Sequence, residues 1–133
     1  SVDYGLSTRS VKWYPDALPV LSTLRKRGYK LGLISNTHWR LLESFRNKIE
    51  RIFDVVTVSY EHGYAKPHPS IFLATLKKLG VGANRCLHVG DDPVADVQGA
   101  KKVRIKTAFI KRENVEANAD VTIDRLRQLL ELL

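Results

Sequence analysis

Apolar segments of helical type and of strand type alternate along this chain from about residue 16 to its last residue. The helical segments repeat apolar residues every three or four positions, whereas the strand segments are short runs rich in β-branched and aliphatic residues. Strands joined by helices of this length require right-handed crossovers, which produce a parallel sheet. The alternation therefore predicts an α/β fold of three layers, with a Rossmann-like parallel sheet and helices on both of its faces.

The limits of the elements follow from the apolar spacing and from residues that begin or end helices. Proline suits the first turn of a helix, glycine suits the position after its last turn, and aspartate suits the position before its first. Helices are expected over Asp16–Arg27, around Trp39–Ile49, over Pro69–Gly80, over Asp92–Lys101 and from Asp124 onward. Strands are expected over Lys30–Ser35, Asp54–Ser59, Cys86–Gly90 and Ile105–Ile110, with a short strand near Val121.

The composition fits one soluble domain and excludes several classes of protein. With 133 residues, of which 44% are hydrophobic and 27% charged, the chain suits a single hydrophobic core. No apolar run is long enough to span a membrane, and no secretory signal opens the sequence. A single cysteine, Cys86, excludes an internal disulfide and indicates a reducing cytoplasm. Its apolar neighbours predict a buried structural thiol.

The net charge of +8 favours anionic partners through long-range attraction. The basic residues are scattered, however, and the chain carries neither a zinc finger nor an aromatic-basic RNA-binding signature. The charge therefore predicts a solvated basic surface rather than a nucleic-acid interface. The four histidines lack the spacing of metal ligands, so we expect structural or surface roles for His38, His62, His68 and His88.

Polar residues gather where three expected strands or their connections end. Ser35 and Asn36 follow one strand, where a hydroxyl and nearby N–H groups suit an oxyanion, although the same residues are favoured as helix caps. Lys66 stands before Pro67-His68-Pro69, a rigid stretch that suits a fixed positive charge as well as an ordinary exposed loop. In parallel sheets, ligands bind beyond such carboxyl ends.

The strongest of these signals is the acidic sequence Gly90-Asp91-Asp92-Pro93-Val94-Ala95-Asp96. Helix capping accounts for Asp92, but not for Asp91 and Asp96 as well. Clustered carboxylates repel one another unless a cation compensates them. A hard divalent ion such as Mg²⁺ and the ammonium group of Lys66 are the natural compensating charges.

The order Ser35, Lys66, Asp91 resembles the haloacid dehalogenase superfamily of hydrolases. The resemblance runs from about Tyr14 to Leu133. The matching stretches are Leu33-Ile34-Ser35-Asn36, Lys66-Pro67-His68-Pro69-Ser70-Ile71-Phe72, and His88-Val89-Gly90-Asp91-Asp92 continuing to Asp96-Val97-Gln98-Gly99-Ala100. Phe53-Asp54 and Ala119-Asp120 match as linking features.

This resemblance implies a role for each matching residue. Ser35 would hydrogen-bond the transferring group, with Asn36 beside it in the substrate site, and Lys66 would neutralise charge at substrate and nucleophile. Asp91 would bind Mg²⁺, Asp96 would orient Lys66 or metal-bound water, and Asp92 would either share the metal shell or cap its helix. Together they imply a Mg²⁺-dependent phosphatase acting on a small phosphorylated substrate through a phosphoaspartyl intermediate.

The nucleophile motif of the family, two aspartates separated by one residue after an apolar strand, does not occur in this sequence. The nearest stretch is Asp3-Tyr4-Gly5-Leu6-Ser7, where Asp3 would be a degenerate nucleophile. We therefore expect residues 1–13 to be a remnant of a cap or a linker, and residues 14–133 to be a hydrolase core that lacks its first central strand. Residues 1–14, or a partner chain, would then cover the open position in the sheet.

The sequence leaves three other functions open. A non-catalytic descendant or fragment would bind phosphate or a partner protein without turnover. A haloacid dehalogenase would use the same scaffold, although the acidic motif suits a bound cation. A receiver domain of the response-regulator type would need its paired aspartates early in the chain, whereas here they come late.

Overall fold

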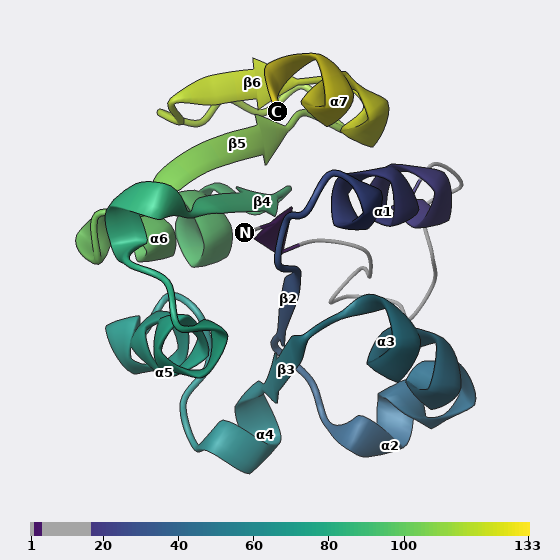
Figure 1. The fold of residues 1–133 in the computed structure, drawn as a ribbon. Helices are drawn as coiled ribbons and strands as arrows, with labels where there is room; N and C mark the ends of the chain where they lie inside the picture. Colours follow the sequence, from purple (N-terminus) through teal and green to yellow (C-terminus); the bar gives the residue numbers. More distant parts are fainter. Residues whose placement is uncertain (1, 4–16) are drawn as a thin grey trace.

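The computed structural model describes residues 2–3 and 17–133 and contains parallel strands covered by helices on both sides (Figure 1). Every pair of hydrogen-bonded strands in this part of the chain is parallel. The predicted α/β fold is therefore confirmed. The strands are β1 (Val2–Asp3), β2 (Gly32–Ser35), β3 (Val55–Val58), β4 (Leu87–Gly90), β5 (Lys106–Ile110) and β6 (Val121–Ile123).

The helices occupy the connections between the strands. They are α1 (Ala17–Lys26), α2 (Trp39–Leu42), α3 (Arg46–Ile52), α4 (Ser59–His62), α5 (Pro69–Leu79), α6 (Gly99–Lys102) and α7 (Leu129–Leu132). Shorter turns are η1 (Glu43–Phe45), η2 (Ala83–Arg85), η3 (Pro93–Gln98, a π-helical turn) and η4 (Leu126–Gln128). The single helix expected around residues 39–49 is thus divided into α2, η1 and α3. The helix expected from Asp92 begins as a π turn, and α4 was not predicted.

Among the described residues, the sheet has two hydrogen-bonded parts, in the orders β1-β4-β5-β6 and β2-β3. Strand β1 pairs with β4, with Val2 opposite Leu87 and Asp3 opposite His88, and it also contacts β2 (Figure 1). The position between β2 and β4, where we expected the first central strand to be lacking and residues 1–14 or a partner chain to cover the gap, is occupied by the two residues of β1. The other residues of the N-terminal segment, 1 and 4–14, lie outside the described part of the chain.

Two aspartates tie neighbouring parallel strands together at their amino ends. The carboxylate of Asp54, just before β3, accepts a hydrogen bond of 2.8 Å from the N–H of Leu31, just before β2. The carboxylate of Asp120, just before β6, accepts one of 2.7 Å from the N–H of Thr107 in β5. That backbone hydrogen bond lowers the pKa of Asp120. These bonds help to set the register of neighbouring strands, and therefore the relative positions of their carboxyl ends.

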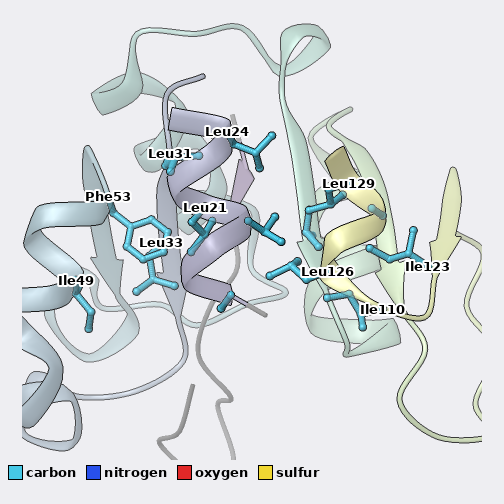
Figure 2. Close-up of a cluster of buried hydrophobic side chains, with 14 of the residues drawn as sticks. Leu21, Leu24, Leu31, Leu33, Ile49, Phe53, Ile110, Ile123, Leu126 and Leu129 are labelled. Carbon is cyan, nitrogen blue, oxygen red and sulfur yellow. The ribbon is translucent and has the colours of Figure 1, made fainter. Parts of the chain in front are cut away.

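One face of the sheet is covered by α1, α3 and α7, and its side chains form a continuous apolar cluster. Figure 2 shows Leu21 of α1 between Leu33 of β2 and Leu126 beside α7. Fully buried aliphatic side chains of this kind each contribute about 1.5–3 kcal/mol through removal from water. Among the described residues, this cluster is the larger of the two and therefore the larger source of apolar stabilisation.

The other face of the sheet is covered by α5 and α6, and its apolar cluster is smaller. Phe72 and Ile71 of α5 pack there against Ile34 of β2 and Ala100 of α6. Gly99 allows this close packing, because a Cβ atom there would lie 2.7 Å from the Phe72 ring.

Cys86 is half-buried, so the prediction of a buried thiol is wrong in degree. It precedes β4 and lines a cavity of about 390 Å³ at the amino ends of the strands, together with Tyr29 and Val121. No helix in the described ranges is both long enough and apolar enough to cross a membrane.

Candidate functional site

A buried ion pair lies where the loop before α5 meets the turn after β4. The ammonium nitrogen of Lys66 is 2.6 Å from Oδ1 of Asp96, and the two residues are only 8% and 5% exposed. Lys66 arrives from the stretch before Pro67, and Asp96 from the first turn of η3. The structure thus brings together two residues that the sequence separates by thirty positions.

The Asp96 carboxylate accepts hydrogen bonds from three directions. Oδ1 accepts from Lys66 and from Nε2 of His88 at 3.0 Å, and Oδ2 accepts from the N–H of Asp92 at 3.1 Å. Burial alone would raise the pKa of Asp96, but the Lys66 charge and the His88 hydrogen bond hold it well below its usual range. The carboxylate is therefore ionised at neutral pH, and it holds the Lys66 ammonium group in place.

Gly90 makes room for this carboxylate. A Cβ atom at position 90 would overlap the carboxyl group of Asp96. Only a residue without a side chain therefore lets Asp96 lie against the end of β4. The glycine of the acidic motif is required for a close approach between a side chain and a strand.

Asn36 fixes the backbone of Lys66 from the end of β2. Its Oδ1 accepts from the N–H of Lys66 at 2.8 Å, and its Nδ2 donates to the Lys66 carbonyl at 3.0 Å. The side-chain amide is thus engaged with the backbone of the loop. The end of β2, which carries Ser35, is thereby joined to the Lys66 loop, and the place of Asn36 in the substrate site stays a prediction.

Ser35 is the last residue of β2 and is 3% exposed. It precedes Asn36, so its position is fixed on one side by the sheet and on the other by the bonds to the Lys66 loop. The next residue, Thr37, accepts hydrogen bonds from the N–H of Tyr60 and the hydroxyl of Ser59 through its carbonyl oxygen. The ends of β2 and β3 and the Lys66 loop are therefore joined around Ser35.

Asp91 and Asp92 are both half-buried at the end of β4. Oδ1 of Asp92 accepts from the N–H groups of Val94 and Ala95, each at 2.9 Å, which is the geometry of a helix cap. Asp92 thus caps its helix, and its share in a metal shell stays a prediction. Within residues 2–3 and 17–133 there is no group of three or more histidine, cysteine or acidic side chains placed to hold a metal ion.

His88 was not recognised as a site residue in the sequence. It is 3% exposed, and its ring meets that of Phe72 edge-on, with 5.1 Å between the ring centroids. The alternation of β4 carries the signal that would have identified it. Leu87 and Val89 belong to the large apolar cluster, so His88 and Gly90 must lie on the opposite face, where Asp96 lies.

The model of the haloacid dehalogenase-like hydrolases matches residues 6–104 of this sequence, which is most of the chain. The chain belongs to this family. The earlier resemblance is thereby confirmed.

The relatives of this family member include several named phosphatases. Glyceraldehyde 3-phosphate phosphatase of Methanopyrus kandleri is 34% identical over 92% of this chain and 57% of its own length. The protein of the same name from Pyrococcus abyssi is 40% identical over 73% of this chain and 42% of its own. Phosphoserine phosphatase of Thermus thermophilus is 31% identical over 87% of this chain and 49% of its own length. The chain thus spans about half the length of these relatives.

Solved structures give the same result for the fold. A HAD (haloacid dehalogenase) phosphatase from Thermococcus onnurineus superposes with a TM-score of 0.83 at 35% identity, over 91% of this chain and 58% of that one. A 2-haloacid dehalogenase from Pseudomonas syringae superposes with a TM-score of 0.76 at 29% identity, over 92% of this chain and 53% of that one. The family scaffold therefore carries both named activities.

Proposed function

We propose that this chain supplies the phosphoryl-binding core of a Mg²⁺-dependent phosphatase that acts on a small phosphorylated substrate through a phosphoaspartyl intermediate. The observation that carries the proposal is the buried pair of Lys66 and Asp96. A buried ion pair is seldom the most stable way to fill a core, because both charges lose their hydration. A cation held at the carboxyl ends of parallel strands has the position and the charge for binding a phosphoryl group.

In this proposal each residue has a distinct task. The Lys66 ammonium group has three N–H donors, so it can serve Asp96 and an oxygen of the transferring phosphoryl group together. The hydroxyl of Ser35 hydrogen-bonds a second phosphoryl oxygen. Asp96 and Asn36 act through Lys66, the first on its ammonium group and the second on its backbone.

The proposed Mg²⁺ site depends on Asp91, which directly follows β4. Carboxylate oxygen is the ligand type that this hard ion prefers, and Mg²⁺ commonly keeps several waters and binds substrate phosphate. One protein carboxylate at the strand end fits that pattern, although Asp92 contributes an oxygen already used as a cap. When bound, the ion would neutralise charge on the phosphoryl group.

The nucleophile has no assignment among these residues. The sequence contains no pair of aspartates separated by one residue after an apolar strand. We therefore propose that these 133 residues bind phosphate but do not turn over a phosphate ester by themselves. The compartment that we propose is the cytoplasm, on the strength of the single cysteine.

Phosphate binding tests this function directly. Calorimetric titration of the chain with orthophosphate, with and without Mg²⁺, should show binding that Lys66→Met weakens tenfold or more. Lys78→Met is the matched control, since Lys78 is exposed on α5 and loses the same charge. Equal weakening by both variants would show that overall charge, and not this site, binds the anion.

The proposed role of Asp91 in binding Mg²⁺ is tested by comparing two variants. Asp91→Asn should abolish the enhancement of phosphate binding by Mg²⁺, while Asp124→Asn, at an exposed position, should retain it. An unchanged Mg²⁺ response in Asp91→Asn would remove this residue from the metal site.

A haloacid dehalogenase is the second candidate, favoured by the structural similarity to the Pseudomonas syringae enzyme. It differs from the first in the leaving group and in needing no metal ion. Release of halide from 2-chloropropionate, independent of Mg²⁺, would support it. Phosphate binding without any turnover would instead agree with the core proposed above or with a non-catalytic descendant.

A further inference from the structure

His88 is a buried polar residue that the proposed phosphatase chemistry leaves without a task. It lies on β4, and its side chain points to the face covered by α5, where it contacts the Phe72 ring. Its Nε2 atom lies 3.0 Å from the same carboxylate oxygen of Asp96 that binds Lys66. A side chain of this kind needs a reason to occupy a core position that an aliphatic residue would fill at lower cost.

The direction of this hydrogen bond follows from the partner. An ionised carboxylate only accepts hydrogen bonds, so Nε2 of His88 carries the proton that it donates to Asp96. Oδ1 then lies between two donors, while the Asp92 N–H fixes Oδ2. The carboxylate is held from three sides and cannot rotate without breaking at least one of these bonds.

We propose that His88 is a positioning residue for Lys66, acting through Asp96. The inference rests on the phosphoryl-binding function proposed above and deepens it. Lys66 alone would draw Oδ1 along the line of the ion pair. A second donor on the same oxygen, from His88, restricts where that oxygen can lie, and the ammonium group bonded to it is therefore restricted as well.

Substitution of His88 separates this role from simple packing. His88→Leu keeps an apolar body and removes the donor, whereas His88→Gln presents an amide N–H close to the place of Nε2. We expect His88→Leu to weaken orthophosphate binding about tenfold, which corresponds to about 1.4 kcal/mol. His88→Gln should stay within about threefold of the unaltered chain.

A matched control comes from a second buried hydrogen bond under α5. The hydroxyls of Thr75 and Thr57 form a buried hydrogen bond of 2.8 Å at another place under α5. Thr75→Val keeps the side-chain shape and removes the hydrogen bonds of this hydroxyl to Thr57 and to the carbonyl oxygen of Ile71. It should lower the melting temperature while leaving phosphate affinity within twofold.

A spectroscopic readout tests the position of Lys66 without any ligand. Nuclear magnetic resonance of lysine ammonium groups should show one slowly exchanging signal, assigned by its loss in Lys66→Met. His88→Leu should shift or broaden this signal, and His88→Gln should restore it. An unchanged signal in His88→Leu, or no protected ammonium signal in the unaltered chain, would overturn the positioning role.

The two readouts keep the two proposals apart. If the unaltered chain binds no phosphate but its Lys66 signal still depends on His88, the phosphatase proposal fails and the positioning contact stands. If phosphate binds and His88→Leu binds it equally well, the proposed function stands and the role of His88 is overturned. Circular dichroism of each variant checks that the chain is folded.

Discussion

On the face of the sheet covered by α1, α3 and α7, the buried side chains are aliphatic or aromatic and form one continuous cluster. On the face covered by α5 and η3, the buried residues include Lys66, His88 and Asp96, which meet at a single carboxylate. Both faces exclude water to a similar degree. The first face stabilises the fold by apolar burial. The second holds a cation at the strand ends, although burying its charges costs hydration free energy.

The two faces also differ in how they tolerate substitution. An apolar cluster can relax around a missing methyl group, whereas a buried charge that loses its partner keeps the full cost of its lost hydration. Perturbing each face separately should therefore give different patterns of stability and binding.

The largest effect is expected for Asp96→Asn, which leaves the Lys66 ammonium group buried without its counter-charge. We expect the free energy of unfolding to fall by about 3–5 kcal/mol, as for other broken buried ion pairs. Urea denaturation followed by circular dichroism measures this change. The double variant Lys66→Met, Asp96→Leu should recover most of the loss and still fail to bind phosphate. A loss below about 1 kcal/mol in Asp96→Asn would mean that the two faces do not differ as described.

A smaller effect is expected on the apolar face from Leu21→Ala. Leu21 of α1 is fully buried, and its truncation should cost about 3 kcal/mol. Leu18→Ala, on the same helix but 38% exposed, should cost less than about 1 kcal/mol. Phosphate affinity should not change in either variant when measured well below the melting temperature. A large loss of affinity in Leu21→Ala would show that the faces are coupled.

Acid should affect the charged face selectively. The pKa of Asp96 is lower in the folded chain than the value of about 3.9 in an unfolded chain, so protons bind the unfolded state more readily. The stabilisation from this group is complete above about pH 4 and is lost as pH falls toward the folded-state pKa. Unfolding free energies measured from pH 6 to pH 3 should therefore decline more steeply in the unaltered chain than in Lys66→Met, Asp96→Leu. The difference in slope can reach about 1.4 kcal/mol per pH unit. Parallel curves would contradict this assignment.

The smallest effect concerns the backbone rather than either kind of side chain. Arg104, in the turn between α6 and β5, has a φ of 64°, a conformation that favours glycine. Arg104→Gly should stabilise the chain by about 0.5–1 kcal/mol, as shown by a higher urea midpoint. Arg104→Ala removes the same charge but keeps the strained conformation, so it should give no such gain. A gain in both variants would point to the charge instead.

Much of the fold was predictable because it depends on local patterns. Helix α5 was predicted correctly from its helical spacing, the proline at its start and the glycine after it. The parallel sheet was predicted from the alternation of helices and strands. Pairing between residues close in sequence, such as the Asp92 cap, was visible in the same way. The division of residues 39–52 into α2, η1 and α3 was not, since helical periodicity continues across those breaks.

The site was predictable only in part, because its contacts join distant positions. The sequence indicated Lys66 and Asp96, but not that Asn36 binds the Lys66 backbone from the end of β2. Metal-ligand spacing does not identify His88, because its partner is a carboxylate eight residues later. Such pairings depend on which strands become neighbours, and local spacing carries little information on that.

The pair of hydrogen bonds between Asn36 and the Lys66 backbone has a consequence for motion. These bonds link the end of β2 to a loop thirty residues away, so the two segments are expected to fluctuate as one unit. A loop residue usually exchanges its amide proton quickly, but the N–H of Lys66 should exchange as slowly as those of the strands. The spacing of Ser35 and Lys66 would then persist through the local openings that loosen other loops.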